Sequence, residues 1–337
     1  MEDLVKKILH GYGLTSYSLF EVQKGYRNQS FPVRLDDGSM LNLILYKREP
    51  DILARIRRAN EVANYVFNCG FPARHTFSSR IARVRSSGGE TYAALYEYLP
   101  GDTIPWEAYS QKHIKLLGKT LSDLHTALQR FDTHHLPSVT EEYLQIIQYM
   151  RWYFASDGVH RALAEKLGLK VDGGVFDKYE MLLEVCGYLP EQQALHMDFV
   201  RSNILFLEED DEPRISGILD FEKTARGNKL FDIGRTLAFL LVDCKYKQSD
   251  KIHKYFLHSG YQKRGTAEFA NISVKTASGR SNLLDQLLNM FLLYDFYKFL
   301  KHNPYEYLYV NEHFVRTRDL LLQRGDVTLS QVSTSRC

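Results

Sequence analysis

The first hundred residues alternate between apolar and polar positions in short runs that predict strands. Such runs occupy residues 17–22, 30–35, 40–47, 80–85 and 91–98. After the third run, apolar residues recur at helical spacing over residues 52–66, with Asp51 placed to cap the helix and Gly70 and Pro72 placed to end it. The pattern predicts five strands with one helix after the third strand.

From residue 106 onward the apolar spacing is mostly helical. Helices are expected at residues 114–128, 141–154, 176–188, 230–241, 251–259 and 283–300. Two short apolar strands, 204–207 and 215–219, flank a polar turn and interrupt this series. The most apolar helix, 283–300, carries Asp295 and Lys298, so it is expected to be a buried core helix rather than a membrane span.

The composition is that of a globular protein. The chain has 337 residues, of which 44% are hydrophobic, and this is enough for two lobes with buried cores. Its 43 basic and 41 acidic residues are interspersed, and the net charge of +2 gives no electrostatic reason to expect a nucleic acid partner. The four cysteines lie far apart, and the first residues lack the apolar stretch of a signal peptide. We therefore expect a soluble cytoplasmic protein with reduced thiols and with neither a nucleic acid nor a membrane as partner.

The strongest chemical signal is the run from His196 to Asn203, which has the form H-x-D-x-x-x-x-N with Asp198 as its acid. Asp220 follows at the end of the second apolar strand, and a hairpin of the two strands would return it to the side where Asn203 lies. Phosphoryl transfer from a nucleotide uses such a set, because one carboxylate orients the attacking hydroxyl while an amide and a second carboxylate hold magnesium. The alternative, a core histidine with a capping aspartate and a turn asparagine, leaves the hairpin unexplained.

Together the strands, the helical half and these two motifs resemble the protein-kinase-like fold, and more narrowly the aminoglycoside phosphotransferase and choline kinase superfamily of small-molecule kinases. The resemblance covers about residues 17–240. The chain differs from protein kinases in three ways, since it has no glycine-rich loop, no A-P-E segment, and Glu222 where a glycine would stand. Residues 227–234 are instead similar to a helix start of that superfamily, in which Asp232 would support the catalytic loop.

The resemblance implies an α+β bilobal fold, with a five-stranded antiparallel N-terminal lobe and a mainly helical C-terminal lobe. It divides the chain into a nucleotide-binding lobe (1–99), a hinge (about 97–102), a helical lobe (102–325) and a tail (326–337). The helical lobe would contain both the catalytic loop, 196–203, and the metal-binding segment, 218–222. By the same resemblance, Asp198 would be the catalytic base, His196 would brace the loop, and Asn203 and Asp220 would hold Mg²⁺.

Residues of the N-terminal lobe would bind the nucleotide, ATP or GTP. Lys47, at the end of the third strand, would contact the phosphates and pair with Glu61 on the following helix. Arg48 is the alternative to Lys47, because side chains alternate along a strand and only one of the two points into the cleft. The remaining contacts would come from the backbone of the linker at Glu97 and Leu99 and from Arg27 near the first turn.

The acceptor is expected beside Asp198, in a pocket formed by residues 141–190 and the helices after residue 245. These segments are rich in aromatic residues, which bind ammonium groups and stack on sugars, although the same spacing also fits core packing. Asp295, Tyr305 and Glu306 are the candidate contacts. The excess of basic residues after Lys245 weighs against a polycationic aminoglycoside.

The leading hypothesis is therefore a Mg²⁺-dependent ATP or GTP phosphotransferase that phosphorylates a hydroxyl of a small molecule. The acceptor would be an antibiotic, an amino alcohol, homoserine or a sugar, and the protein a monomer or homodimer. Two alternatives stay open. One is a protein kinase that acts on a peptide side chain, and the other is a pseudokinase that binds a nucleotide without catalysis.

Overall fold

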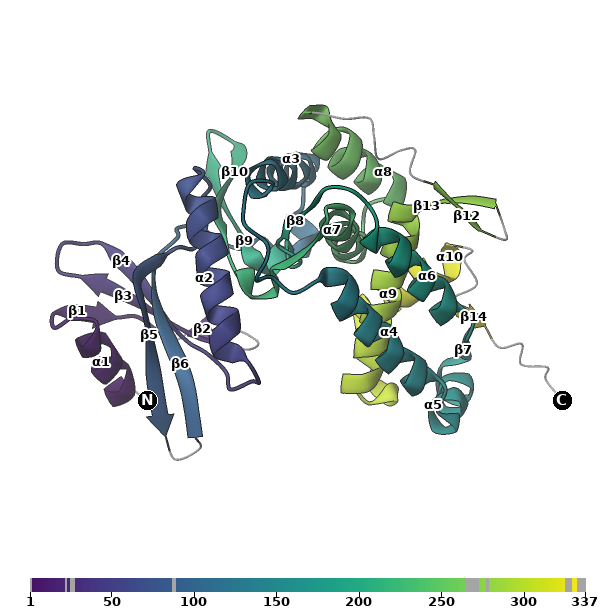
Figure 1. The fold of residues 1–337 in the computed structure, drawn as a ribbon, viewed down its shortest axis with the longest axis horizontal. Coiled ribbons are helices and arrows are strands. Elements are labelled where there is room, and N and C mark those ends of the chain that lie inside the picture. Colours follow the sequence, from purple (N-terminus) through teal and green to yellow (C-terminus); the bar gives the residue numbers. More distant parts are fainter. Residues whose placement is uncertain are drawn as a thin grey trace. The chain divides into compact units, whose positions relative to one another are not determined.

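The computed structural model describes residues 2–21, 23–24, 28–86, 89–264, 273–276, 279–324 and 329–331. The chain forms two compact units, and Figure 1 labels their helices and strands along the ribbon. Unit 1 contains residues 1–103 and 202–224, and unit 2 contains residues 104–201 and 225–337. The predicted α+β class is confirmed, because unit 1 is built on an antiparallel sheet and unit 2 is mainly helical.

The sheet of unit 1 has its main strands in the order β1-β3-β4-β6-β5. Their bounds are Tyr17–Leu19 (β1), Gln29–Leu35 (β3), Met40–Leu45 (β4), Thr76–Ser86 (β5) and Gly89–Glu97 (β6). These are the five strands that the alternation of apolar residues predicts. The sequence analysis missed a short strand, β2 (Gln23–Lys24), which pairs with β3, and a first helix, α1 (Glu2–Gly11).

The two faces of this sheet bury different sets of side chains. On one face, Leu41 and Leu43 of β4 join a hydrophobic cluster that contains Val5 and Leu9 of α1. On the other face, Ile44 and the following Tyr46 join a cluster with the first turns of α2 (Ile52–Asn68). The chain from β4 onward therefore presents its even-numbered side chains to α2 and its odd-numbered ones to the α1 side.

The predicted cap of α2 is wrong. Asp51 occupies the N-cap position, but its side chain makes no capping hydrogen bond and its backbone is left-handed, with φ 56° and ψ 16°. A side chain caps a helix from an extended N-cap backbone, so the left-handed conformation turns this carboxylate away from the first free N–H groups. The helix itself spans the predicted residues.

The predicted pair of apolar strands forms a hairpin of β9 (Ile204–Glu209) and β10 (Glu212–Ile218). This hairpin belongs to unit 1, whereas the sequence analysis assigned it to the helical lobe, 102–325. The reason is backbone pairing, since Asp102 bridges Phe206 and Ala73 bridges Ile218. The predicted metal-binding segment, 218–222, thus belongs to the unit that carries the sheet.

Unit 2 is mainly helical, and two of its helices, α7 (Leu230–Asp243) and α9 (Leu283–His302), are largely buried. Its helices are α3 (Gln111–Leu128), α4 (Val139–Phe154), α5 (Asp157–Ala162), α6 (Val175–Gly187), α7 (Leu230–Asp243), α8 (Ser249–His253), α9 (Leu283–His302) and α10 (Glu312–Gln323). Helices α7 and α9 pack together and are buried along most of their length, and Gly234 of α7 lies against Phe291 of α9. Short strand pairs complete the unit, namely β8 (Gln192–Leu195) with β11 (Ala225–Asn228), β7 (Leu169–Val171) with β14 (Leu329–Gln331), and β12 (Ser273–Thr276) with β13 (Gly279–Asn282).

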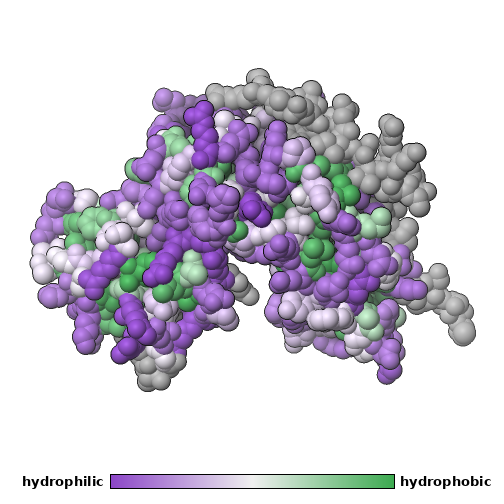
Figure 2. All heavy atoms as spheres, in the orientation of Figure 1, coloured by the Kyte–Doolittle hydropathy of each residue, from purple (hydrophilic) through white to green (hydrophobic). Residues whose placement is uncertain are grey.

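Hydrophilic side chains cover most of the visible surface of each unit, with hydrophobic patches interspersed among them (Figure 2). Among the helices that the structure describes, none has the length and apolar character that crossing a membrane requires. For α9 this agrees with the sequence analysis, because the helix is buried in unit 2 and its Asp295 lies in the protein interior.

Candidate active site

The predicted catalytic loop, 196–203, begins at His196, directly after β8 of unit 2. Strand β8 is anchored by its pairing with β11, and α7 begins two residues after β11 ends. Asp232 in the first turn of α7 accepts hydrogen bonds from the backbone N–H groups of His196 (2.7 Å) and Met197 (2.6 Å). Met197 has a left-handed backbone with φ 60°, which is unfavourable for a residue with a side chain. Asp232 therefore holds the loop in a strained conformation directly before Asp198, as the resemblance implied.

Asp232 is itself fixed from the other side by His125 of α3. The His125 Nε2 atom lies 3.1 Å from the Asp232 carboxylate, and its Nδ1 atom lies 2.7 Å from the Tyr261 hydroxyl. Burial acts to raise the pKa of Asp232, but the hydrogen bond to His125 and the loop groups together hold that pKa below its usual value. The sequence analysis missed His125 and Tyr261. The only local signal for this contact is that His125 lies on the apolar side of a predicted helix.

His196 contacts the loop from the protein interior. Its ring is fully buried, and its Nδ1 atom accepts the backbone N–H of Asp198 at 3.2 Å. The ring also meets the Phe199 ring edge-on, with centroids 5.9 Å apart. The Phe199 carbonyl accepts the hydroxyl of Thr236 on α7 at 3.1 Å. Helix α7 thus holds the loop on both sides of Asp198, which is 7% exposed.

A buried ion pair joins α7 to α9 in the same unit. The Arg235 guanidinium binds both carboxylate oxygens of Asp295, at 2.8 and 3.0 Å, and Lys298 adds a contact at 2.7 Å. Burial acts to raise the pKa of Asp295, but Arg235 and Lys298 lower it to about 2. Asp295 was predicted to contact the acceptor. Both of its oxygens are paired with cations of its own chain, and its contact with the acceptor stays a prediction.

The other two predicted acceptor contacts lie in a single turn, Tyr305–Val310. The Tyr305 hydroxyl is 3.1 Å from that of Tyr153 on α4. The Glu306 carboxylate forms an exposed ion pair with Lys166 at 2.6 Å. The partner of Tyr305 thus lies on α4, and the partner of Glu306 lies in the helical segment Leu163–Leu167. The contact of Tyr305 and Glu306 with an acceptor stays a prediction.

The two predicted magnesium ligands lie at neighbouring strand ends in unit 1. Asn203 directly precedes β9, and its carbonyl accepts the backbone N–H of Leu219 at 2.8 Å, which brings the chain on to Asp220. The predicted return of the hairpin is therefore confirmed. Asp220 has a left-handed backbone, with φ 55° and ψ 71°, and its carboxylate accepts the backbone N–H of Glu222 at 3.3 Å.

An amide oxygen and a carboxylate fit magnesium, which takes few protein ligands and completes its octahedron with water and phosphate oxygens. In the described part of the chain, no group of three or more acidic, histidine or cysteine side chains is arranged to hold a metal. Asn203 and Asp220 would therefore need the phosphates of a nucleotide as further ligands.

Glu222 and Asn28 form a contact beside Asp220 that the sequence analysis missed. Glu222 is 9% exposed, and its carboxylate accepts a hydrogen bond from the Asn28 side chain at 2.9 Å. Burial and the neighbouring Asp220 raise the pKa of Glu222, against the opposing effect of Arg74. Asn28 also accepts the backbone N–H of Lys47 at 3.1 Å. The end of β4 is thereby tied to the segment that carries Asp220.

The residues predicted to bind the nucleotide are exposed or partly exposed where the structure describes them. Lys47 and Glu61 are both exposed, Lys47 beyond the end of β4 and Glu61 on α2. At the predicted hinge, Glu97 gives its backbone N–H to His75, while Leu99 is partly exposed. Arg27 lies outside the described residues.

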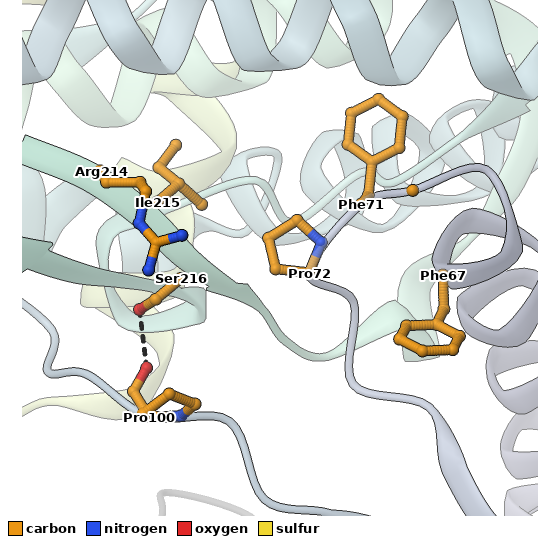
Figure 3. A pocket seen from close by; sticks show the side chains of 8 residues that line it. Phe67, Phe71, Pro72, Pro100, Arg214, Ile215 and Ser216 are labelled. Carbon is orange, nitrogen blue, oxygen red and sulfur yellow. Dashed lines mark hydrogen bonds between the residues drawn. The ribbon is translucent and has the colours of Figure 1, made fainter.

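Unit 1 also contains a pocket of about 480 Å³ near the end of α2 (Figure 3). It is lined by Phe67, Gly70, Phe71, Pro72, Pro100, Arg214, Ile215 and Ser216, and the Ser216 hydroxyl donates to the Pro100 carbonyl at 2.6 Å. None of the predicted site residues is in this lining, so the pocket is separate from the candidate active site.

Known proteins share the sequence pattern of this chain. Residues 19–245 match the profile of the family described as "Phosphotransferase enzyme family". The hydroxylysine kinase of Danio rerio is 25% identical over 253 residues, which cover 72% of this chain and 69% of that protein.

Solved structures of small-molecule kinases share the fold. A microcompartment-associated aminopropanol kinase aligns with a TM-score of 0.70 at 15% identity, over 94% of this chain and 96% of that one. An amicoumacin kinase in complex with AMP-PNP and Ca²⁺ aligns with a TM-score of 0.67 at 14% identity, over 97% of this chain and 98% of that one. At these identities the alignments establish the kinase-like fold.

Proposed function

This chain belongs to the phosphotransferase enzyme family, and we propose that it transfers the γ-phosphoryl group of ATP or GTP to a hydroxyl of a small molecule, with Mg²⁺ as cofactor. The observation that carries the proposal is the support of the catalytic loop. Asp232 binds the two backbone N–H groups before Asp198, and Thr236 binds the carbonyl just after it. A carboxylate held in this way is preorganised to orient an acceptor hydroxyl.

In the proposed reaction Asp198 accepts the proton of the acceptor hydroxyl. The acceptor oxygen bonds to the γ-phosphorus while the bond from that phosphorus to the β–γ bridging oxygen breaks, and the nucleoside diphosphate leaves. The side-chain oxygens of Asn203 and Asp220 would hold the metal, which would neutralise charge on the phosphates. His196 fixes the position of Asp198 by accepting its backbone N–H.

An amino alcohol is the acceptor that we favour. The names of two relatives support this class, because hydroxylysine and aminopropanol each carry an amine and a hydroxyl. The basic C-terminal segment of this chain weighs against a polycationic aminoglycoside, which would meet repulsion there.

The test is nucleotide turnover by purified protein with Mg²⁺ and either ATP or GTP, against hydroxylysine, aminopropanol, sugars and aminoglycosides. We expect acceptor-stimulated turnover with an amino alcohol, and a loss of roughly 10²–10⁴ in rate for Asp198→Ala. Asp250→Ala, which removes an exposed acid from α8, is the control. Full turnover by folded Asp198→Ala would refute the assigned base, and stimulation only by a sugar would refute the acceptor class.

A further inference from the structure

The position of Lys47 conflicts with a role at the phosphates. Tyr46 lies on the α2 face of the sheet, where Ile44 and Tyr96 are also buried. Side chains alternate along an extended chain, so the next residue, Lys47, faces the opposite way. It is also exposed and lies past the last paired residue of β4. Arg48 is exposed too, and its guanidinium is bound to the Gly89 carbonyl at 3.0 Å.

Arg74 is a partly buried cation whose backbone is anchored near Asp220. Its N–H donates to the Ile218 carbonyl at 3.0 Å, and Ala73 forms a bridge with Ile218. Ile218 is the last residue of β10 and lies two positions before Asp220. The backbone of Arg74 is therefore bound in the same unit as the predicted metal ligands, at the end of β10 that precedes Asp220.

The Arg74 side chain is held over an aromatic ring. Its guanidinium carbon lies 4.9 Å from the centre of the Tyr96 ring, and the Tyr96 hydroxyl donates to Asn60 of α2 at 2.7 Å. Among the described residues, none accepts a hydrogen bond from this guanidinium. Stacking fixes the plane of a guanidinium but leaves the N–H groups at its edge free to bind planar or tetrahedral anions.

The charge of Arg74 interacts with the acids Asp220 and Glu222. Burial acts to lower the pKa of Arg74, but Tyr46, Tyr96, Asp220 and Glu222 together raise it above its usual value. The neighbouring Arg55 already forms an ion pair with Glu49. Among the described residues of unit 1, Arg74 is thus a cation that interacts electrostatically with Asp220 and keeps donors for a ligand.

We propose that Arg74, and not Lys47, binds the phosphates of the nucleotide beside Asp220. This inference rests on the proposed function, because it presumes that unit 1 binds a nucleoside triphosphate. The ligand groups would be phosphate oxygens, which an arginine binds through two parallel N–H groups. The residue comes from the segment after α2 rather than from a strand of the sheet, which is why its sequence position carried no signal.

The test compares the binding of Mg²⁺–ATP and of adenosine by calorimetry, in wild type and in Arg74→Gln, Lys47→Gln and Arg57→Gln. Arg57 is an exposed arginine of α2 and serves as the matched control. We expect Arg74→Gln to weaken the binding of ATP about tenfold or more, since a charged hydrogen bond to the phosphates is lost. Its affinity for adenosine should stay within about twofold of wild type, because only the phosphates lose a partner.

Three results would overturn the proposal. The first is an unchanged affinity of Arg74→Gln for ATP. The second is a loss of adenosine affinity in Arg74→Gln as large as its loss of ATP affinity, which would make Arg74 a structural residue. The third is a loss of affinity for ATP, but not for adenosine, in Lys47→Gln. Arg74→Lys distinguishes the cases further, because it keeps the charge and should recover part of the ATP affinity. A wild type that binds neither ATP nor GTP would instead refute the proposed function.

Discussion

Asp232 shows how one buried residue fixes the backbone of the predicted catalytic loop. Its two oxygens receive the N–H groups of His196 and Met197 and the ring of His125, and its exposed fraction is 1%. A carboxylate can accept all of these bonds at once because it has about four lone-pair positions and no proton to place. An amide has the same shape but replaces one acceptor with a donor, so it cannot satisfy the same partners.

We therefore expect Asp232→Asn to leave at least one buried donor unpaired. The loss should lower the free energy of unfolding by about 1–3 kcal/mol, and the loosened loop should lower turnover with the nucleotide. Urea unfolding followed by tryptophan fluorescence measures the first effect. Asp250→Asn, at an exposed acid of α8, is the control, and an Asp232→Asn protein that is as stable as this control would show that the contact is not needed.

At the scale of elements, Arg235 and Asp295 link the two buried helices of unit 2. The pair joins positions 60 residues apart, and the contact between Asn28 and Glu222 joins positions 194 apart. Strands and helices could be predicted because their apolar spacing is local, and the motif of residues 196–203 could be recognised because its members lie close together in the sequence. The pairing of Asp295 with Arg235 could not be predicted for the opposite reason, since an acid in an apolar helix looks the same in the sequence whether it meets a substrate or a distant arginine.

Asp295→Asn should strongly destabilise unit 2, because it leaves Arg235 buried without its counter-charge. Breaking such a pair costs about 3–5 kcal/mol. The folded pKa of Asp295 is about 2, below its ordinary value of 3.8, so the stabilisation is complete above pH 3.8 and is lost as the pH falls toward 2. Unfolding of wild type and variant should thus differ most near neutral pH and converge in acid. A difference that stayed constant down to pH 2 would contradict this account.

At the scale of the whole molecule, the predicted chemistry is divided between the two units. Asn203 and Asp220 belong to unit 1 with the sheet, and Asp198 belongs to unit 2 with the helices. The sequence placed all three in one lobe, because the motif is continuous along the chain and nothing local shows that a hairpin of 202–224 pairs with residues 73 and 102. Backbone pairing over a long sequence separation decides this boundary.

This division predicts that nucleotide binding and catalysis can be separated by mutation. Asp220→Asn should weaken Mg²⁺–nucleotide binding by about tenfold or more, because a metal ligand loses its charge, while asparagine still tolerates the left-handed backbone at this position. Asp198→Ala should bind the nucleotide within about threefold of wild type and yet lose turnover. Asp210→Asn, at the exposed turn of the same hairpin, controls for the loss of an acid. If Asp198→Ala instead lost nucleotide affinity as Asp220→Asn does, the base and the metal ligands would not act separately, and the assignment of roles by unit would fail.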